Sequence, residues 1–254
     1  MKAKIFVFDI ETAPNLADVW NYWNTNVGIN QVRKNGRMIM WAGKYLHDKK
    51  MYSMNEIDDG QEATVKGLSA HFEDTDILVG HNGDGFDIKW LNWELLKHEL
   101  PPPDPSKTVD TLKTCRKRFK LPSYKLDYIC PLLGLGKKVG NETGHRLWID
   151  WEAKTPKAKK NMIKYCKNDV MMLQRLYYKI RPWISNHPNM GLYDDKGRPT
   201  CPNCGGTKVV KKGLAYTNAG VYQRWRCKDC GTPLRGKTMM TDVIHRKNAL
   251  TQEK

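Results

Sequence analysis

Three groups of acidic residues, far apart in the sequence, have side chains that could act together on a cation. The first group is Asp9 and Glu11, at the end of the apolar run Lys4–Ile10 (KIFVFDI), which predicts a strand buried on both faces. Because the two acids are two residues apart, a strand directs both side chains to one face. Acids at the end of a buried strand are costly unless a cation meets them, although a strand emerging into solvent would also carry them.

The second and third groups are predicted to lie on helices. Asp87 follows a glycine-rich turn and begins the predicted helix Phe86–Leu100, where an ordinary helix cap is the simpler interpretation. Tyr165 and Asp169 are four residues apart in the predicted helix Pro156–Ile180, so they share one helix face. Taken alone, Asp169 would most simply be an exposed acid.

Four of the seven cysteines form two close pairs near the end of the sequence. The pairs are CPNC and CKDC, formed by Cys201, Cys204, Cys227 and Cys230. Each CxxC turn places two sulfur atoms on one ion, and four thiolates suit tetrahedral zinc. A disulfide framework is not expected in an intracellular chain of this size, and a redox CxxC motif is the remaining alternative. The spacing therefore predicts one structural Zn²⁺.

The elements that must position these residues alternate between strands and helices. Predicted strands are Lys4–Ile10, Arg37–Leu46, Met51–Met54, Asp76–Gly80 and Thr108–Asp110, and predicted helices are Gln61–Asp74, Phe86–Leu100, Tyr124–Leu133 and Pro156–Ile180. This pattern predicts an α/β layered domain.

The basic run Lys113–Lys120 suits a phosphate-contacting helix or a solvated face equally well. Core or rim packing is the expectation for most of Trp20, Trp23, Trp90, Trp93, Trp148 and Trp151.

The three acidic groups together resemble the DEDD exonuclease superfamily. The motifs are Asp9-Ile-Glu11, then Asn82-x-x-x-Phe86-Asp87, then Tyr165-x-x-x-Asp169. The tyrosine marks the subgroup typified by the proofreading exonuclease domain of family-B DNA polymerases, which the segment Tyr124–Tyr128 and the pair Leu133-Gly134 also match weakly. The resemblance covers roughly residues 3–180 and implies an RNase H-like mixed sheet flanked by helices. Since no polymerase palm or fingers follows, we expect a stand-alone exonuclease or a subunit.

The resemblance also implies roles for individual residues. In a two-metal phosphodiester hydrolase, carboxylates hold two Mg²⁺ or Mn²⁺ ions; here the ligands would be Asp9, Glu11, Asp87 and Asp169. Tyr165 would orient the attacking water, because a phenol with an unperturbed pKa of about 10 is a poor base at neutral pH. Asn82 and Phe86 match positions that border the substrate's 3′ end. The implied activity is 3′→5′ exonuclease cleavage, of DNA more than RNA, with single-stranded ends preferred.

The charge distribution indicates a polyanionic partner. The chain has a net charge of +16, and its last 59 residues hold 13 Lys and Arg against 3 Asp and Glu. This excess favours nucleic-acid binding by the predicted zinc ribbon, although a solubilising surface would look similar. Arg224, Trp225 and Arg226 are the candidate contacts, with Trp225 equally suited to filling the ribbon's small core. A ribbon can also bind protein, and a replication or repair protein would then be the expected partner.

The composition and segment boundaries complete the expectation. With 40% hydrophobic and 28% charged residues, the chain is not of the disordered or collagen-like class. No run of about 18 apolar residues and no signal peptide is recognisable, so we expect a cytoplasmic protein of a bacterium or a phage-infected cell. The predicted segments are an exonuclease domain (1–185), a linker (186–199), a zinc ribbon (200–237) and a basic polar tail (238–254).

Three other functions remain open on the sequence. An exoribonuclease would use the same active site. A non-catalytic nucleic-acid-binding adaptor would keep the fold, but it has no need of carboxylates that repel phosphate. A transposon-type recombinase is suggested by the ribbon alone.

Overall fold

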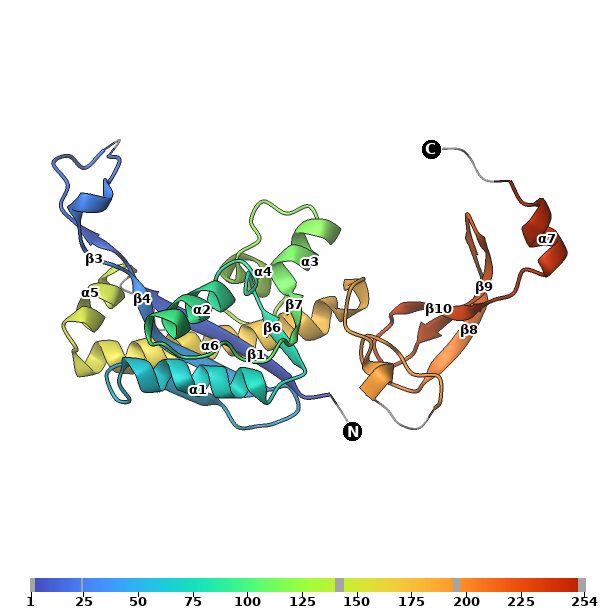
Figure 1. Cartoon of the computed structure of the whole chain (residues 1–254), viewed down its shortest axis with the longest axis horizontal. Helices are drawn as coiled ribbons and strands as arrows, with labels where there is room; N and C mark the ends of the chain where they lie inside the picture. Colours follow the sequence, from blue (N-terminus) through green and yellow to red (C-terminus); the bar gives the residue numbers. More distant parts are fainter. Residues whose placement is uncertain (1–2, 24, 140–143, 194–196, 251–254) are drawn as a thin grey trace. The chain divides into compact units, whose positions relative to one another are not determined.

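The computed structural model describes residues 3–23, 25–139, 144–193 and 197–250. Two compact units divide the chain: Lys4–Tyr178, and Lys179–Lys254 together with the first three residues (Figure 1). This division falls seven residues before the predicted start of the linker at residue 186. Residues 194–196 of the predicted linker and 251–254 of the predicted tail lie outside the described residues.

The first unit is built on a five-stranded mixed sheet. Its strand order is β5–β4–β1–β6–β7, with bounds Tyr52–Asn55, Arg37–Tyr45, Ile5–Ala13, Ile77–Gly80 and Lys107–Asp110 (Figure 1). The strands β1, β4 and β5 pair antiparallel, whereas β6 pairs parallel with both β1 and β7. The predicted mixed α/β sheet flanked by helices is therefore confirmed. The central strand β1 is the strand that carries the first two acids.

Strand alternation assigns the two faces of β1 to different helices. Phe6, Phe8 and Ile10 belong to a buried cluster with residues of α1 (Gln61–Glu73) and α2 (Asp87–Lys97). The intervening residues point to the opposite face. There the long helix α6 (Pro156–Ile180) packs, since its Cys166 thiol lies 3.6 Å from the Asp9 carbonyl oxygen. The sheet is thus enclosed between helices, and Asp9 and Glu11 lie on the α6 face.

Several elements of this unit differ from the sequence-based expectation. The elements that were not predicted are β2 (Leu16–Ala17), η1 (Ile29–Gln31), β3 (Val32–Lys34) and α5 (Arg146–Glu152). The helix α4 (Leu126–Leu132) lies within its predicted range, and α3 (Thr111–Arg118) overlaps the basic run. The helix α2 ends at Lys97, three residues before the predicted end. Glu99 there adopts a left-handed φ of 55°, and the Leu100 amide bonds back to the Leu95 carbonyl at 2.9 Å, which stops the helix.

The second unit is a small antiparallel sheet with short helical turns. Its strands, in the order β10–β9–β8, are Pro233–Met239, Gly220–Cys227 and Val209–Thr217, and its helices are η2 (Arg181–Trp183), η3 (Met190–Tyr193) and α7 (Val243–Asn248). Part of the predicted linker is structured, because η3 forms there and the Met190 amide bonds to the Pro202 carbonyl at 2.8 Å. Among the helices in the described residues, none has the length and apolar character needed to cross a membrane.

Candidate active site

The first pair of acids lies in the middle of the sheet. Asp9 and Glu11 face Ala42 and Met40 of the neighbouring strand β4, and the register between the strands shifts directly after Glu11. Because they are two residues apart in β1, both side chains point to the α6 face. There an oxygen of each and the Cys166 sulfur all lie within 4.8 Å of one another. Glu11 is only 7% exposed. Two carboxylates and a thiol therefore share one small, largely buried space.

Asp87 approaches this space from the first turn of α2, and its charge acts on Asp9. Its Oδ1 atom accepts a hydrogen bond from the Ile10 amide at 3.1 Å, so the carboxylate is fixed to the backbone between the two acids of β1. The turn before α2 must be very tight, because a Cβ on Gly80 would lie 2.9 Å from the Gly83 Cα atom. The glycines thus allow the chain to fold back far enough for Asp87 to meet β1.

The third acidic group is held by a lysine that the sequence analysis missed. Lys138 Nζ lies 2.7 Å from a carboxylate oxygen of Asp169 and donates a hydrogen bond to Tyr165 Oη at 2.5 Å. Tyr165 and Asp169 are four residues apart on α6, as the helical spacing predicts, and both are buried. Lys138 lies in a loop whose sequence (GKKV) does not distinguish it from its neighbour Lys137, so only the long-range contact identifies it.

The electrostatics of the cluster favour neutral acids when no cation is bound. Burial, followed by the charges of the neighbouring carboxylates, raises the pKa of Asp9 well above its ordinary value. Burial likewise raises the pKa of Glu11 to about 8 and that of Asp87 to about 7. The pKa of Asp169 is also raised by burial, although the Lys138 ammonium opposes this change. Four acids that repel one another in a desolvated space need positive charge to ionise together.

The donor set fits a hard divalent cation. Carboxylate oxygens are the ligands that Mg²⁺ and Mn²⁺ prefer, and these ions take several of them at once. The Asp169 Oδ1 atom is buried and has no hydrogen-bond partner among the described residues, so it is available as a ligand. Asp87 and Asp169 lie outside the 4.8 Å group formed by Asp9, Glu11 and Cys166. The Cys166 thiol is a softer donor, and its pKa is raised by burial.

A pocket of about 340 Å³ opens beside Glu11. Its lining residues are Ile10, Glu11, Thr12, Pro14, Phe86, His145 and Trp148. Phe86, a predicted substrate contact, therefore lines the same pocket as Glu11, whereas Asn82 does not line this pocket. The Asn82 backbone instead takes a left-handed φ of 70°, with its amide bonded to Asp110 Oδ1 at 3.1 Å. Trp148, for which core or rim packing was expected, is partly buried, and its indole N–H donates a hydrogen bond to the Thr12 carbonyl at 3.1 Å.

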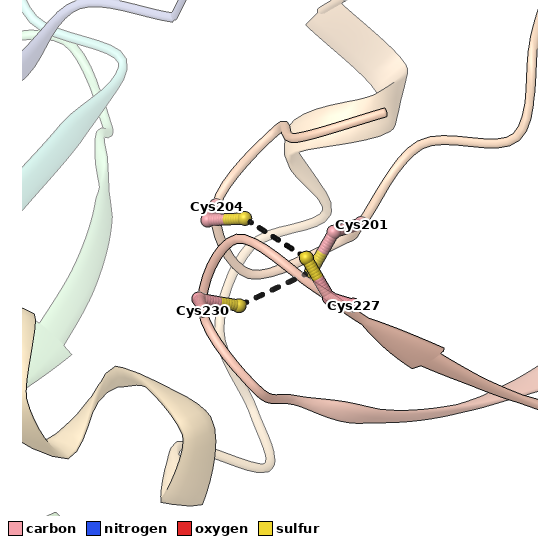
Figure 2. Close-up of side chains that lie close together, drawn as sticks. All are labelled: Cys201, Cys204, Cys227 and Cys230. Atoms are coloured by element: carbon pink, nitrogen blue, oxygen red, sulfur yellow. Dashed lines mark hydrogen bonds between the residues drawn. The ribbon is translucent and has the colours of Figure 1, made fainter. Parts of the chain in front are cut away.

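The second unit gathers the four paired cysteines. Their sulfur atoms lie within 4.8 Å of one another, and Figure 2 shows them meeting from two loops. The Cys201–Cys230 sulfur distance is 3.7 Å and the Cys204–Cys227 distance is 3.6 Å. In each knuckle the glycine after the second cysteine has positive φ, at 72° for Gly205 and 80° for Gly231. Four sulfur donors at this spacing fit one tetrahedral zinc ion, so the cluster fits a zinc ribbon.

The ribbon separates the three residues that the sequence analysis grouped as nucleic-acid contacts. In β9, Arg224 and Arg226 alternate with Trp225, so the tryptophan lies on the opposite face of the sheet. The register pairs Trp225 with Lys211 on one side and Leu234 on the other, and the Lys211 ammonium lies 5.8 Å from its ring centre. A flat surface cannot contact both faces at once. The two arginines and the tryptophan are therefore not one contact patch.

Comparison with known proteins supports the RNase H-like fold expected for the first unit. A family model described as the RNase_H superfamily matches residues 6–181. No curated protein matches the chain. Among solved structures, the chain is similar to the family B DNA polymerase from the hyperthermophilic archaeon Pyrobaculum calidifontis, with a TM-score of 0.52 and 18% identity. The match covers 71% of this chain but only 25% of the polymerase chain, and at this identity it is evidence for the fold alone.

Proposed function

Because the chain belongs to the RNase H superfamily, we propose that it is a metal-dependent 3′→5′ exonuclease that hydrolyses phosphodiester bonds of DNA, with single-stranded ends preferred. The observation that carries the proposal is the buried carboxylate cluster on β1, α2 and α6, in which burial raises the pKa of every acid. A binding protein for a polyanion gains nothing from such a cluster, whereas a two-metal nuclease requires one.

The four acids would hold two Mg²⁺ or Mn²⁺ ions. Asp9 and Glu11 would contribute ligands from the sheet, Asp87 from the start of α2, and Asp169 from α6. When bound, such ions activate a water molecule and stabilise the negative charge on the leaving oxygen. The Ile10 amide holds Asp87 in place through its Oδ1 atom. The second carboxylate oxygen of Asp87 does not take part in this hydrogen bond and would serve as the metal ligand.

Tyr165 would position the attacking water rather than deprotonate it. Burial raises the pKa of Tyr165 to about 12, so the phenol keeps its proton at neutral pH. Its oxygen accepts a hydrogen bond from Lys138 and retains its own proton for donation to a water or a phosphate oxygen. Lys138 thereby fixes the tyrosine and reduces the negative charge that an incoming phosphate meets.

The pocket beside Glu11 would hold the 3′-terminal nucleotide. Its aromatic residues Phe86 and Trp148 offer faces on which a base can stack, next to the carboxylates that would hold the metal ions. The 3′→5′ direction and the preference for DNA follow from the resemblance to proofreading domains. The zinc ribbon would add non-specific affinity through its basic residues.

A digestion time course tests this function. The full zinc-loaded chain would be incubated with Mg²⁺ or Mn²⁺ and with DNA or RNA of one sequence, labelled at the 5′ end. We expect a ladder that shortens from the 3′ end, faster on DNA. Asp87→Asn should slow cleavage by about 100-fold or more, on the scale that charge-stabilising groups contribute.

Asp84→Asn is the matched control, because Asp84 lies in the same turn but forms a surface ion pair with Lys113. It should cleave like the wild type. Faster cleavage of RNA would make the protein an exoribonuclease. Intact substrate together with tight, salt-sensitive binding would reject the enzyme and leave a nucleic-acid-binding adaptor.

A further inference from the structure

The helix α2 has two opposite faces, one fully buried against the sheet and one that is partly exposed. Leu91 and Leu95 are buried against the sheet. Phe86, Lys89, Trp90 and Trp93 follow the spacing i, i+3, i+4 and i+7, which places them along a second stripe. Trp93 is 53% exposed and Phe86 is 40% exposed. Since Trp20 and Trp23 are also exposed, at 95% and 86%, the expectation of core or rim packing for most of the six tryptophans is wrong.

This second stripe forms a pocket of its own. It is an open depression with a volume of about 350 Å³, lined by Gly85, Phe86, Lys89, Trp90 and Trp93. Trp90 forms a fixed part of it, since this ring packs against the buried core and meets Phe86 edge-on with ring centres 6.3 Å apart. Trp93 is the exposed wall. An aromatic pocket with one wall fixed and one exposed suits a flat ring that stacks.

The pocket adjoins the candidate active site through Phe86, which lines both this pocket and the one beside Glu11. A strand whose terminal nucleotide lies beside Glu11 must pass Phe86 before it reaches Trp93. Lys89 lines the aromatic pocket, and its ammonium has no ion pair or hydrogen bond among the residues that the structure describes. A free cation beside stacking rings matches the two parts of a nucleotide, the base and the phosphate.

We propose that the Phe86–Trp93 pocket binds a nucleotide of the substrate strand upstream of the scissile bond, with the base stacked on Trp93 and the adjacent phosphate near Lys89. The proposal rests on the proposed nuclease function. It makes the pocket a binding subsite for single-stranded nucleic acid, with no part in bond cleavage. Phe86 separates the terminal nucleotide from this upstream nucleotide.

Abasic substrates test the proposal by binding alone. The full zinc-loaded chain, in Ca²⁺ to avoid turnover, would be titrated into fluorescent single-stranded 12-mers with one abasic site at the second, third or fourth nucleotide from the 3′ end. Loss of one stacked base should weaken wild-type binding by about 5- to 150-fold at one of these positions. Trp93→Ala should weaken binding of the intact strand similarly, and the abasic site at that position should then cost nothing more.

Leu96→Ala is the control on the same helix, because Leu96 is 69% exposed and does not line the pocket. It should bind like the wild type, and Lys89→Ala should reduce the salt dependence while the abasic pattern stays. The proposal would be overturned if Trp93→Ala bound the intact strand as tightly as the wild type. It would also be overturned if the abasic site weakened wild-type binding equally at all three positions. If cleavage is absent but the abasic pattern appears, the nuclease function fails and the subsite stands; if cleavage occurs with a flat pattern, only the subsite fails.

Discussion

Burial raises the pKa values of the acids in the candidate site, and Lys138 opposes part of this rise. It pairs with Asp169 at 2.7 Å and lowers the pKa of that carboxyl group against the effect of burial. Removing the ammonium leaves Asp169 buried among other acids, so its pKa should rise and the ionised, metal-binding form should appear only at higher pH.

We therefore expect Lys138→Ala to move the acidic limb of the pH–rate profile of cleavage to higher pH. Lys137→Ala should leave the limb in place, since Lys137 is the exposed neighbour. The profile is measured as kcat/KM on a single-stranded substrate between pH 5 and 9. An unchanged limb in Lys138→Ala would show that this lysine does not control ionisation of the acids.

The raised pKa values of the acids also couple stability to pH. Glu11 and Asp87 have pKa values of about 8 and about 7 in the folded protein, against ordinary values of 4.5 and 3.8. A raised folded-state pKa stabilises the protein below the unfolded pKa, and this stabilisation is lost as pH rises through the folded pKa. Without Mg²⁺, these groups should thus make the free energy of unfolding of the first unit fall as the pH rises from about 5 to about 8.

Divalent ions should reverse this loss, because they bind the ionised acids. We expect Mg²⁺ or Mn²⁺ to raise the melting temperature of the zinc-loaded protein much more at pH 8 than at pH 5. Thermal unfolding followed by near-ultraviolet circular dichroism measures the increment. An equal increment at both pH values would contradict the account of the cluster.

The strand β9 shows how element geometry decides which residues can act together. Arg224 and Arg226 share a face with Arg235, whose guanidinium stacks on Tyr222 with its carbon 4.3 Å from the ring centre. If this face contacts phosphates, replacing both β9 arginines by alanine should make the plot of log affinity against log salt concentration shallower by about 1.4 for a single strand.

Trp225→Ala should instead destabilise the ribbon and leave the salt slope of the folded protein unchanged, because Trp225 lies on the other face. Lys66→Ala, which removes an exposed lysine paired with Glu62 on α1, is the charge control. Binding isotherms at several salt concentrations give the slopes. Equal slopes for the double arginine variant and the wild type would assign the arginine face to another partner.

The elements also show what a single sequence can specify. The runs that became β1 and α6 were predictable because their apolar patterns are long and regular, and α6 begins and ends where expected. The split between Arg224 and Trp225 could have been predicted from the two-residue period of a strand. The exposure of Trp93 could not, because helical spacing defines the stripes of α2 but not which stripe the sheet covers. The role of Lys138 depends on contacts made across 27 residues or more.

For the whole molecule, the two units should respond differently to loss of zinc. The first unit has its own sheet and core, whereas the ribbon is a small three-stranded sheet with a four-cysteine cluster at one end of its strands, and its folding should depend on the metal. Cys227→Ser should therefore unfold the ribbon and leave the first unit intact. We expect cleavage of saturating short substrates to persist while KM for long substrates rises; loss of kcat on all substrates would contradict the separation of roles.

The most direct test of the buried carboxylate cluster is the number of Mn²⁺ ions that the zinc-loaded chain binds, measured by electron paramagnetic resonance of the free ion. The wild type should bind two Mn²⁺ ions at pH 8, and Asp9→Asn should lose at least one of them together with cleavage. Asp84→Asn should keep both. A wild type that binds no Mn²⁺ under conditions in which it cleaves DNA, or an Asp9→Asn variant that binds two ions as tightly as the wild type, would contradict the two-metal site.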